Sequence, residues 1–405
     1  MTSPDPTVAF DLAIVGGGIV GLTLAAALKD SGLKIAIIEA LPPEQSREKP
    51  QAYALSLLSA RVWEGVGVWP ALFPHLGKFE RIQLSDGFYP GVVPFRAEEL
   101  TGDYLGYVGE HRQILTALQT FLDGAENLRW FCPAEVTGFQ AGADWTEITL
   151  GRGDARQSVK AKLLIGTDGA QSQIRALAGI QTRGWRYPQA CVAVTVQHQA
   201  TQNVTAFERF WQTGPMGVLP LPGNRVQVVW TLPLAEAQAM VQVDPDIFIG
   251  ALQSRLGESF GTLELVGKRR FFPVRLMQAR RYVQPRLALA GDAAHGCHPV
   301  GGQGLNLGIR DSAALAEVIL GAHRQGLDIG QLSVLKQYEA WRYPENLVIL
   351  AFTDFLNRFF SNGFLPFLLL RRLGLELLRR VAPLKLLALR LMTGLLGRRP
   401  QIAQQ

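Results

Sequence analysis

The sequence is poor in cysteine, in charged residues and in uninterrupted hydrophobic runs. Of its 405 residues only three are cysteines, Cys132, Cys191 and Cys297, and no CxxC or CxxH spacing links them. This spacing argues against a metal site and a disulfide framework, and it favours a reducing compartment such as the cytoplasm. No stretch of about 18 to 20 residues is both apolar and free of charge, so we expect no membrane-spanning helix.

Charge is also unevenly placed. Charged residues make up 18% of the chain against 48% hydrophobic residues, which excludes a disordered or fibrous protein. The formal net charge is +6, but residues 365–405 alone carry eight Lys or Arg and one Glu. Residues 1–364 are therefore close to neutral, which argues against nucleic acid as a partner.

A strand-helix-strand unit with a glycine-rich turn opens the chain. An apolar run at 8–15 ends in the sequence GGGIVG (16–21), a helical pattern follows, and a second apolar run at 34–38 ends at Glu39. This order predicts a β-α-β unit of a parallel sheet that binds a dinucleotide, either NAD or FAD. Glu39 stands where a carboxylate accepts hydrogen bonds from a ribose diol.

Each glycine of this turn has a physical task. Gly16 allows the tight turn, Gly18 lets the backbone approach a pyrophosphate, and Gly21 lets the helix pack closely on the strand. The helix N-terminus offers free N–H groups and a partial positive charge to the phosphates.

Two later segments, each after a predicted buried strand, carry a family resemblance. They read GTDGAQSQIR (166–175) and GDAAHGCHPVGGQGLNLG (291–308). Together with the first turn they resemble the GxGxxG, DG and GD motifs of the FAD-dependent aromatic hydroxylases, the group of para-hydroxybenzoate hydroxylase. The last segment is most similar to the ubiquinone-biosynthesis hydroxylases of the polyprenylphenol type, and the resemblance spans about residues 8–345.

The patterns predict an α/β protein, α+β overall: a Rossmann-like FAD-binding parallel sheet, an inserted antiparallel β-sheet substrate domain and C-terminal helices. A helix is expected at 52–66. The expected division is FAD-binding domain at 1–180 with an excursion to the substrate domain at about 80–105, substrate domain at 181–276, FAD-binding domain again at 277–340, and a helical segment at 341–405 with a basic tail from 365.

The resemblance implies a set of cofactor contacts. Asp292 would accept a hydrogen bond from a ribitol hydroxyl, although it suits a helix N-cap as well. Gly301, Gly302 and Gly304 would offer backbone N–H groups to the flavin pyrimidine end. The residues expected to hold FAD are Gly16, Gly18, Gly21, Glu39, Arg112, Asp168, Gly169, Gly291, Asp292, Gly301, Gly302, Gly304 and Asn306.

For several of these residues the sequence also allows an interpretation without a cofactor contact. Asp168, supported by Arg175, would lie near the pyrophosphate and assist nicotinamide-nucleotide binding, or it is a solvated strand-end carboxylate. Arg112 matches a family arginine that reaches the cofactor, yet alone it is a charged helix-face residue. Gln51 departs from the family, which usually has Arg before the ALS sequence, so Arg47 or Lys49 is the candidate substitute.

The flavin-ring environment is expected to include His295, Pro299 and Gly302. His295 and His298 lack a third metal ligand at sensible spacing and lack a nucleophile elbow, so they predict neither a metal site nor a catalytic dyad. Candidates for substrate activation in the inserted sheet are Tyr187, Arg209 and Trp211.

The resemblance implies a FAD-dependent monooxygenase that takes hydride from NAD(P)H, reacts with O2 through a flavin hydroperoxide and hydroxylates a lipophilic, prenylated phenol in quinone biosynthesis. Only one GxGxxG is present, so NAD(P)H is expected to bind transiently on the flavin domain. Two alternatives stay open: a flavin-dependent isoprenoid reductase or epoxidase on the same scaffold, and a non-catalytic flavin-binding scaffold of a membrane-surface quinone-synthesis complex.

The leucine-rich end allows two interpretations. At 365–399, Leu369, Leu373 and Leu377 share one helical face, while Arg371, Arg372, Glu376, Arg379 and Arg380 are expected on another. This pattern is typical of an interfacial helix that makes peripheral membrane contact, or of a helix that packs its leucines on the body. Membership in a quinone-biosynthesis complex or a homo-oligomer is a further expectation.

Overall fold

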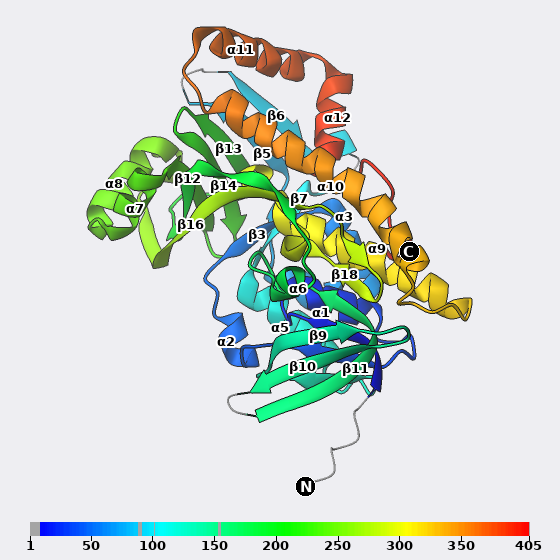
Figure 1. The fold of residues 1–405 in the computed structure, drawn as a ribbon. Coiled ribbons are helices and arrows are strands. Elements are labelled where there is room, and N and C mark those ends of the chain that lie inside the picture. The colour runs from blue at the N-terminus through cyan, green and yellow to red at the C-terminus, as the bar shows by residue number, and fades with distance from the viewer. Residues whose placement is uncertain (1–8, 88–90, 101, 153–154, 405) are drawn as a thin grey trace.

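Two eight-stranded sheets organise the chain in the computed structural model, which describes residues 9–87, 91–100, 102–152 and 155–404 (Figure 1). The first sheet has a parallel centre, in which β1 pairs with β11 and β2, β2 with β8, and β11 with β18. Its strands, along the sheet, are β17 (Val283–Gln284), β18 (Leu287–Leu289), β11 (Ala155–Gly166), β1 (Ala9–Val15), β2 (Ile35–Ile38) and β8 (Leu128–Phe131), with β9 (Glu135–Ala141) and β10 (Thr146–Arg152) paired beside β11.

The central strands of this sheet are almost wholly apolar because helices cover them. All four residues of β2 are buried, as parallel strands covered on both faces require. The helices are α1 (Ile19–Ala27), α2 (Pro43–Arg47), α3 (Leu57–Val66), α4 (Trp69–Leu72), α5 (His111–Leu122), α6 (Gln173–Leu177) and the long α9 (Gln303–Arg324), of which α1 packs against both α5 and α9.

The second sheet is antiparallel except between β13 and β5. Along the sheet its strands are β19 (His295–Gly296), β16 (Glu264–Ala279), β12 (Thr182–Gln197), β15 (Arg225–Pro233), β14 (Gly214–Leu221), β13 (Thr205–Trp211), β5 (Arg81–Asp86) and β6 (Val92–Arg96). Helices α7 (Leu234–Gln242) and α8 (Pro245–Leu256) pack on it. A small sheet, β3 (Ala52–Ser56), β7 (Gly106–Glu110) and β4 (Gly77–Phe79), stands between the two.

Three helices end the chain: α10 (Leu332–Phe360), α11 (Leu365–Arg380) and α12 (Ala382–Met392). In Figure 1 the long α10 runs past both sheets, and α11 and α12 lie beyond β5 and β6 at the top of the view. Within the described residues, none of the helices combines the length and apolarity that crossing a bilayer requires.

The α/β fold class is confirmed, with one local correction. Residues 52–66 do not form one helix, because the first five pair with β7 as strand β3. Helix α3 starts only after Ser56, whose side chain accepts a hydrogen bond from the Ser59 N–H as an N-cap. The division into domains stays a prediction, although β5 and β6 do reach the second sheet from the expected excursion at about 80–105.

Candidate active site

One large cavity joins the two sheets and the C-terminal helices. Its volume of about 1440 Å³ exceeds the roughly 300–1,000 Å³ usual for a single small ligand, so it has room for a dinucleotide together with a second molecule. The expected site residues that line it are Gly16, Gly18, Glu39, Asp168, Gly169, Asp292, Pro299, Gly301, Gly302 and Gly304. Those that the structure places outside its lining are Gly21, Arg112, Gly291, His295 and Asn306.

The turn between β1 and α1 fits a pyrophosphate. A Cβ on Gly21 would lie 2.1 Å from the carbonyl oxygen of Gly16, so only glycine lets the helix come this close to the turn. A Cβ on Gly18 would meet nothing within 4 Å, because this residue faces the cavity. Gly18 is the N-cap of α1, with no side-chain cap and no acidic residue in the first turn. The first N–H groups of α1 are thus available to an anion, as a FAD pyrophosphate requires.

Glu39 closes the same end of the cavity. Its Oε2 accepts a hydrogen bond from the Gly17 N–H at 2.6 Å, and its Oε1 accepts one from the Leu41 N–H at 2.9 Å. These two contacts fix the carboxylate beside the glycine turn, where its remaining lone pairs can accept ribose hydroxyls.

Asp168 lies between the turn into α6 and the cavity, and its role beside the pyrophosphate stays a prediction. Its carboxylate accepts hydrogen bonds from the Ser172 hydroxyl at 2.5 Å and the Ile174 N–H at 3.0 Å, which orders the turn into α6, and it also lines the cavity. Arg175 lies behind this turn and donates to the carbonyl oxygens of Ala293 at 2.8 Å and Ala170 at 3.0 Å. Arg175 therefore ties the loop of Asp168 to the loop of Asp292.

Asp292 opens onto the cavity from the segment after β18. Protein nonetheless surrounds its carboxylate closely enough that burial raises its pKa, against the opposing effect of His295 and Arg275. A carboxylate at the end of a parallel strand is placed to accept a ribitol hydroxyl.

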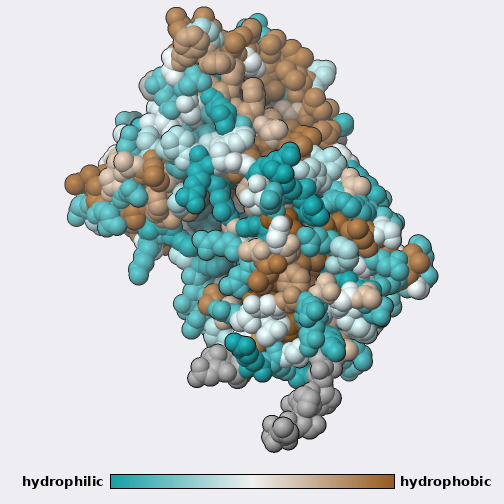
Figure 2. Space-filling view, in the orientation of Figure 1, coloured by the Kyte–Doolittle hydropathy of each residue, from teal (hydrophilic) through white to brown (hydrophobic). Residues whose placement is uncertain are grey.

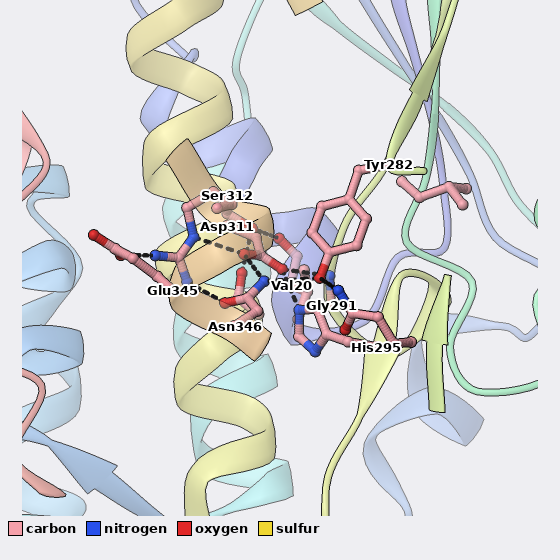
Figure 3. A network of polar contacts seen from close by, with 12 residues as sticks. Val20, Tyr282, Gly291, His295, Asp311, Ser312, Glu345 and Asn346 are labelled. Atoms are coloured by element: carbon pink, nitrogen blue, oxygen red, sulfur yellow. Dashed lines mark hydrogen bonds and ion pairs between the residues drawn. The ribbon is translucent and has the colours of Figure 1, made fainter. Parts of the chain in front are cut away.

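His295 faces away from the cavity into a buried polar network (Figure 3). Its Nε2 lies 2.5 Å from Oδ2 of Asp311, and the same oxygen accepts a hydrogen bond from the Gly291 N–H at 3.1 Å. Oδ1 of Asp311 accepts hydrogen bonds from Arg342 Nε at 2.8 Å and Asn346 Nδ2 at 3.0 Å. His295 and Arg342 together hold the pKa of Asp311 well below its usual range. The network thus positions the Gly291–Asp292 loop from behind, a role other than the predicted one beside the flavin ring.

The glycine-rich segment before α9 does face the cavity. Gly301 and Gly302 have φ values of +69° and +60°, a left-handed conformation that favours glycine, and a Cβ on Gly302 would lie 2.8 Å from the Cβ of Ala54. Asn306 fixes the segment from the buried side, since its Nδ2 donates to the carbonyl oxygens of Gly302 and Ala54, each at 2.8 Å. The N-terminus of α9 is thereby held toward the cavity, as the flavin pyrimidine end requires.

On α5 the residue that lines the cavity is not the predicted Arg112 but its neighbour His111. Arg112 is exposed and does not line the cavity, whereas His111 does. Burial lowers the pKa of His111 to about 4, so the ring is neutral at pH 7. Its Nε2 donates to the Ser46 carbonyl oxygen at 2.9 Å, which leaves Nδ1 to accept from the Tyr53 hydroxyl at 3.2 Å. His111 therefore fixes Tyr53, another residue of the cavity wall.

Cations outside the glycine and acid motifs also face the cavity, and one of them, Lys49, is a candidate substitute for the family arginine. Lys49 and Gln51 line it, while Arg47 instead donates a hydrogen bond to Gln119. Arg270 and Arg275 reach it from β16, and Nη1 of Arg270 is buried without a hydrogen-bond partner in the described part of the chain. Such a donor suits an anionic group. No pattern in the sequence identified Arg270 and Arg275 as binding groups.

The substrate-activation candidates of the inserted sheet lie elsewhere. Tyr187 donates its hydroxyl to Asp354 at 2.6 Å, and Arg209 donates to the carbonyl oxygens at the end of α8. Neither these two nor Trp211 belongs to the cavity lining, whereas Glu208, between them in sequence, does. Side chains alternate across a strand, so Arg209 and Trp211 fall on the face of β13 opposite to Glu208.

The far end of the cavity is lined by α10, α11 and α12, and we call this part the apolar arm. Its wall includes Phe352, Phe355, Phe359, Leu378, Leu387 and Leu391. Helix α11 is docked beside it by a buried ion pair in which Arg371 Nε lies 2.7 Å from Oδ2 of Asp86, with both side chains 1% exposed. Arg371 therefore does not share the exposed charged face predicted for it.

The opposite side of α11 is open. Leu369, Leu373 and Leu377 are 59%, 56% and 45% exposed, and Figure 2 shows a hydrophobic surface at the top of the view, where Figure 1 places α11 and α12. Basic charge of the tail is in part paired with acids of the body, as for Lys385 with Glu99 at 2.6 Å. The helix thus docks through a narrow face that includes Arg371 and Leu375, and it leaves Leu369, Leu373 and Leu377 exposed.

Comparisons with known proteins agree with this geometry. The family model described as "FAD binding domain" matches residues 9–347. An uncharacterized protein of Synechocystis sp. is 58% identical over 97% of this chain and 95% of its own length, and the ubiquinone hydroxylase UbiL of Rhodospirillum rubrum is 38% identical over 96% and 91%. The crystal structure of p-nitrophenol 4-monooxygenase PnpA from Pseudomonas putida superposes with a TM-score of 0.81, over 97% of this chain and 100% of that chain, at 19% identity, which shows a shared fold.

Fold, cavity and relatives define a class: the protein is a FAD-dependent monooxygenase, of a family whose members use NAD(P)H. Within that class, the chain belongs to the family of the FAD-dependent hydroxylases that includes the ubiquinone hydroxylases.

Proposed function

We propose that the enzyme hydroxylates the aromatic ring of a phenol that carries a long isoprenoid tail, a precursor of a membrane quinone. The observation that carries this proposal is the single cavity that joins the cofactor motifs to the apolar arm. A polar ring substrate alone would not need a second chamber lined by phenylalanine and leucine. The relatives named as ubiquinone hydroxylases support the same substrate class.

The residues present fit FAD, which supplies the redox chemistry when bound. The α1 N-terminus would hold its pyrophosphate, Glu39 its ribose, Asp292 its ribitol and the α9 N-terminus its pyrimidine end. Lys49, Arg270 and Arg275 are the cations available to the phosphates of NAD(P)H, which has no glycine motif of its own here. The chain itself orients the two reactants and excludes water around the ring.

The exposed leucines of α11 support contact with a membrane surface. A long isoprenoid tail partitions into lipid, and the apolar arm lies directly beneath α11 and α12. Insertion of the leucine face into the interface, with arginines around it, would let the tail pass from the bilayer into the arm without crossing water. The enzyme would then work as a peripheral protein at the cytoplasmic side of a membrane.

Mass spectrometry of lipid quinones tests the proposal in a strain that lacks this gene. The expected result is loss of the mature quinone and accumulation of a precursor that lacks one hydroxyl group. A normal quinone profile would overturn the proposal. A precursor with an extra double bond would favour an isoprenoid reductase, a precursor that lacks an oxygen on its tail would favour an epoxidase, and restoration of the quinone by a variant unable to oxidise NAD(P)H would favour a scaffold.

A further inference from the structure

A single carboxylate lies in the cavity wall between the cofactor segment and the apolar face of the second sheet. Glu208 belongs to β13, and its neighbours on the same strand face, Ala206 and Phe210, line the cavity as well. Opposite it on β14 stands Gly217, where an added Cβ would be in ordinary van der Waals contact with Oε2 of Glu208, at 3.7 Å.

The contacts of Glu208 place it at the boundary of the cofactor site. The Gly301 N–H donates a hydrogen bond to its Oε2 at 3.1 Å, and Gly301 belongs to the segment expected beside the flavin ring. In the described part of the chain its carboxylate forms no ion pair and no other hydrogen bond. One carboxylate oxygen is therefore left to bind a donor from the substrate.

Burial raises the pKa of Glu208 to about 7, against the opposing effect of the Gly301 N–H. A group with this pKa both accepts and releases a proton near neutral pH, which is what general acid–base catalysis requires. Four other carboxylates line the cavity. Asp168 holds the turn into α6, and Glu39 holds two N–H groups at its own end of the cavity. Asp292 lies at the position expected for the ribitol, and Glu135 is exposed on β9.

We propose that Glu208 is a catalytic residue that accepts the proton of the substrate's phenolic hydroxyl as the ring is hydroxylated. The O–H bond of the phenol breaks, an O–H bond forms on the carboxylate, and the electron pair stays on the phenolic oxygen. The charge on that oxygen makes the ring more electron-rich, so the ring attacks an electrophilic oxygen more readily. The role rests on the proposed function, because only a phenolic substrate carries this proton.

Binding of a short phenol, 2-prenylphenol, to the FAD-loaded enzyme tests the contact without turnover. Flavin absorbance reports Kd at pH values on both sides of 7. For the wild type, Kd should rise as the pH falls below 7, by up to about tenfold per unit, because a proton competes with the phenol for the carboxylate. Glu208→Gln should bind with a Kd that does not depend on pH, whereas the exposed Glu236→Gln on α7 should match the wild type.

Turnover gives the second readout. Glu208→Gln should lower kcat for hydroxylation by about 10² or more and remove the acid limb near pH 7 from kcat/KM, while NAD(P)H oxidation continues without hydroxylated product. Glu208→Asp keeps a titrating carboxyl and should retain an acid limb, which tests the proposal even if the Gln variant folds poorly.

The outcomes separate this role from the proposed function. A wild-type enzyme that hydroxylates no prenylated phenol would refute the proposed function. A wild-type enzyme that does so, beside a Glu208→Gln variant with the same pH dependence of Kd and kcat/KM, would refute only the role of Glu208.

Discussion

The two ends of the cavity are built on different principles. The cofactor end consists of backbone N–H groups at helix starts, glycines without side chains and carboxylates at strand ends, and a buried polar network around Asp311 holds one of its loops from behind. The apolar arm consists of side chains from three helices, and the outer face of one of these helices is open to solvent. This difference indicates that the first end recognises a fixed cofactor by geometry and the second receives a flexible tail by hydrophobic contact.

Gly21→Val should abolish FAD binding at the cofactor end of the cavity. The Cβ would lie 2.1 Å from the Gly16 carbonyl oxygen, so helix α1 must move away from the turn and its N–H groups lose the pyrophosphate position. After incubation with FAD and removal of the free cofactor by gel filtration, we expect the variant protein to show no flavin absorbance. Gly250→Ala on α8, where a Cβ meets nothing within 4 Å, is the control and should stay yellow. Flavin retained by the valine variant would contradict the account of the turn.

Asp311→Asn should show that the cofactor end depends on its buried network. The substitution removes the buried charge partner of Arg342 and leaves it only the partly exposed Glu345. Loss of one member of a buried ion pair costs about 3–5 kcal/mol of unfolding free energy. Chemical denaturation measures this difference. Because the folded protein lowers the pKa of Asp311, the carboxylate stabilises the fold fully above its unfolded pKa of about 3.9 and loses that effect as the pH falls.

The acid dependence provides the control for this variant. The wild type should lose stability on acidification more steeply than Asp311→Asn, which carries no titrating group at this position. Equal slopes in both proteins would mean that the network does not hold the carboxylate ionised.

At the other end, replacement of Leu369, Leu373 and Leu377 together by Ser should weaken binding to anionic lipid vesicles. Partial burial of three leucines in the interface is worth about 2 kcal/mol in sum, which corresponds to about a 30-fold loss of affinity in a sedimentation assay. The matched control is Ile247→Ser, which removes a residue that is 62% exposed on α8. If the triple variant sediments with vesicles as the wild type does, α11 is not the contact surface.

Gly374→Phe should distinguish substrates by their tails. Gly374 lines the apolar arm from α11 and has open space around its Cβ position, so a phenyl ring there fills the arm. We expect KM to rise about tenfold, or about 1.4 kcal/mol, for a long-tailed phenol and to change little for a tailless phenol. An equal effect on both substrates would place the tail elsewhere.

The same contrast explains what the sequence could predict. The glycine turns can be recognised in the sequence because only certain residue types tolerate their backbone geometry. Gly16, Gly18 and the segment at 301–304 were therefore predicted at the cavity, where the structure places them. The direction in which a side chain points is harder to predict from the sequence. His295 is next to the predicted cofactor loop but faces Asp311, and Arg112 is exposed while His111, one residue earlier on the helix, lines the cavity.

No sequence motif marks the residues at the substrate end of the cavity. Glu208, Arg270 and the wall of the apolar arm come from strands and helices far apart in the sequence, and their shared surface arises only on folding. For the tail, periodicity predicted the leucine face correctly. It misplaced Arg371, because the partner that buries this arginine, Asp86, lies nearly 300 residues earlier in the chain.

Isotopically labelled O2 offers the most direct test that one cavity serves both cofactor and tailed phenol. Purified enzyme with FAD, NAD(P)H and a polyprenylated phenol should yield a product with one labelled oxygen on the aromatic ring, located by fragmentation in the mass spectrometer. A product without label, or with the label on the tail, would contradict the account.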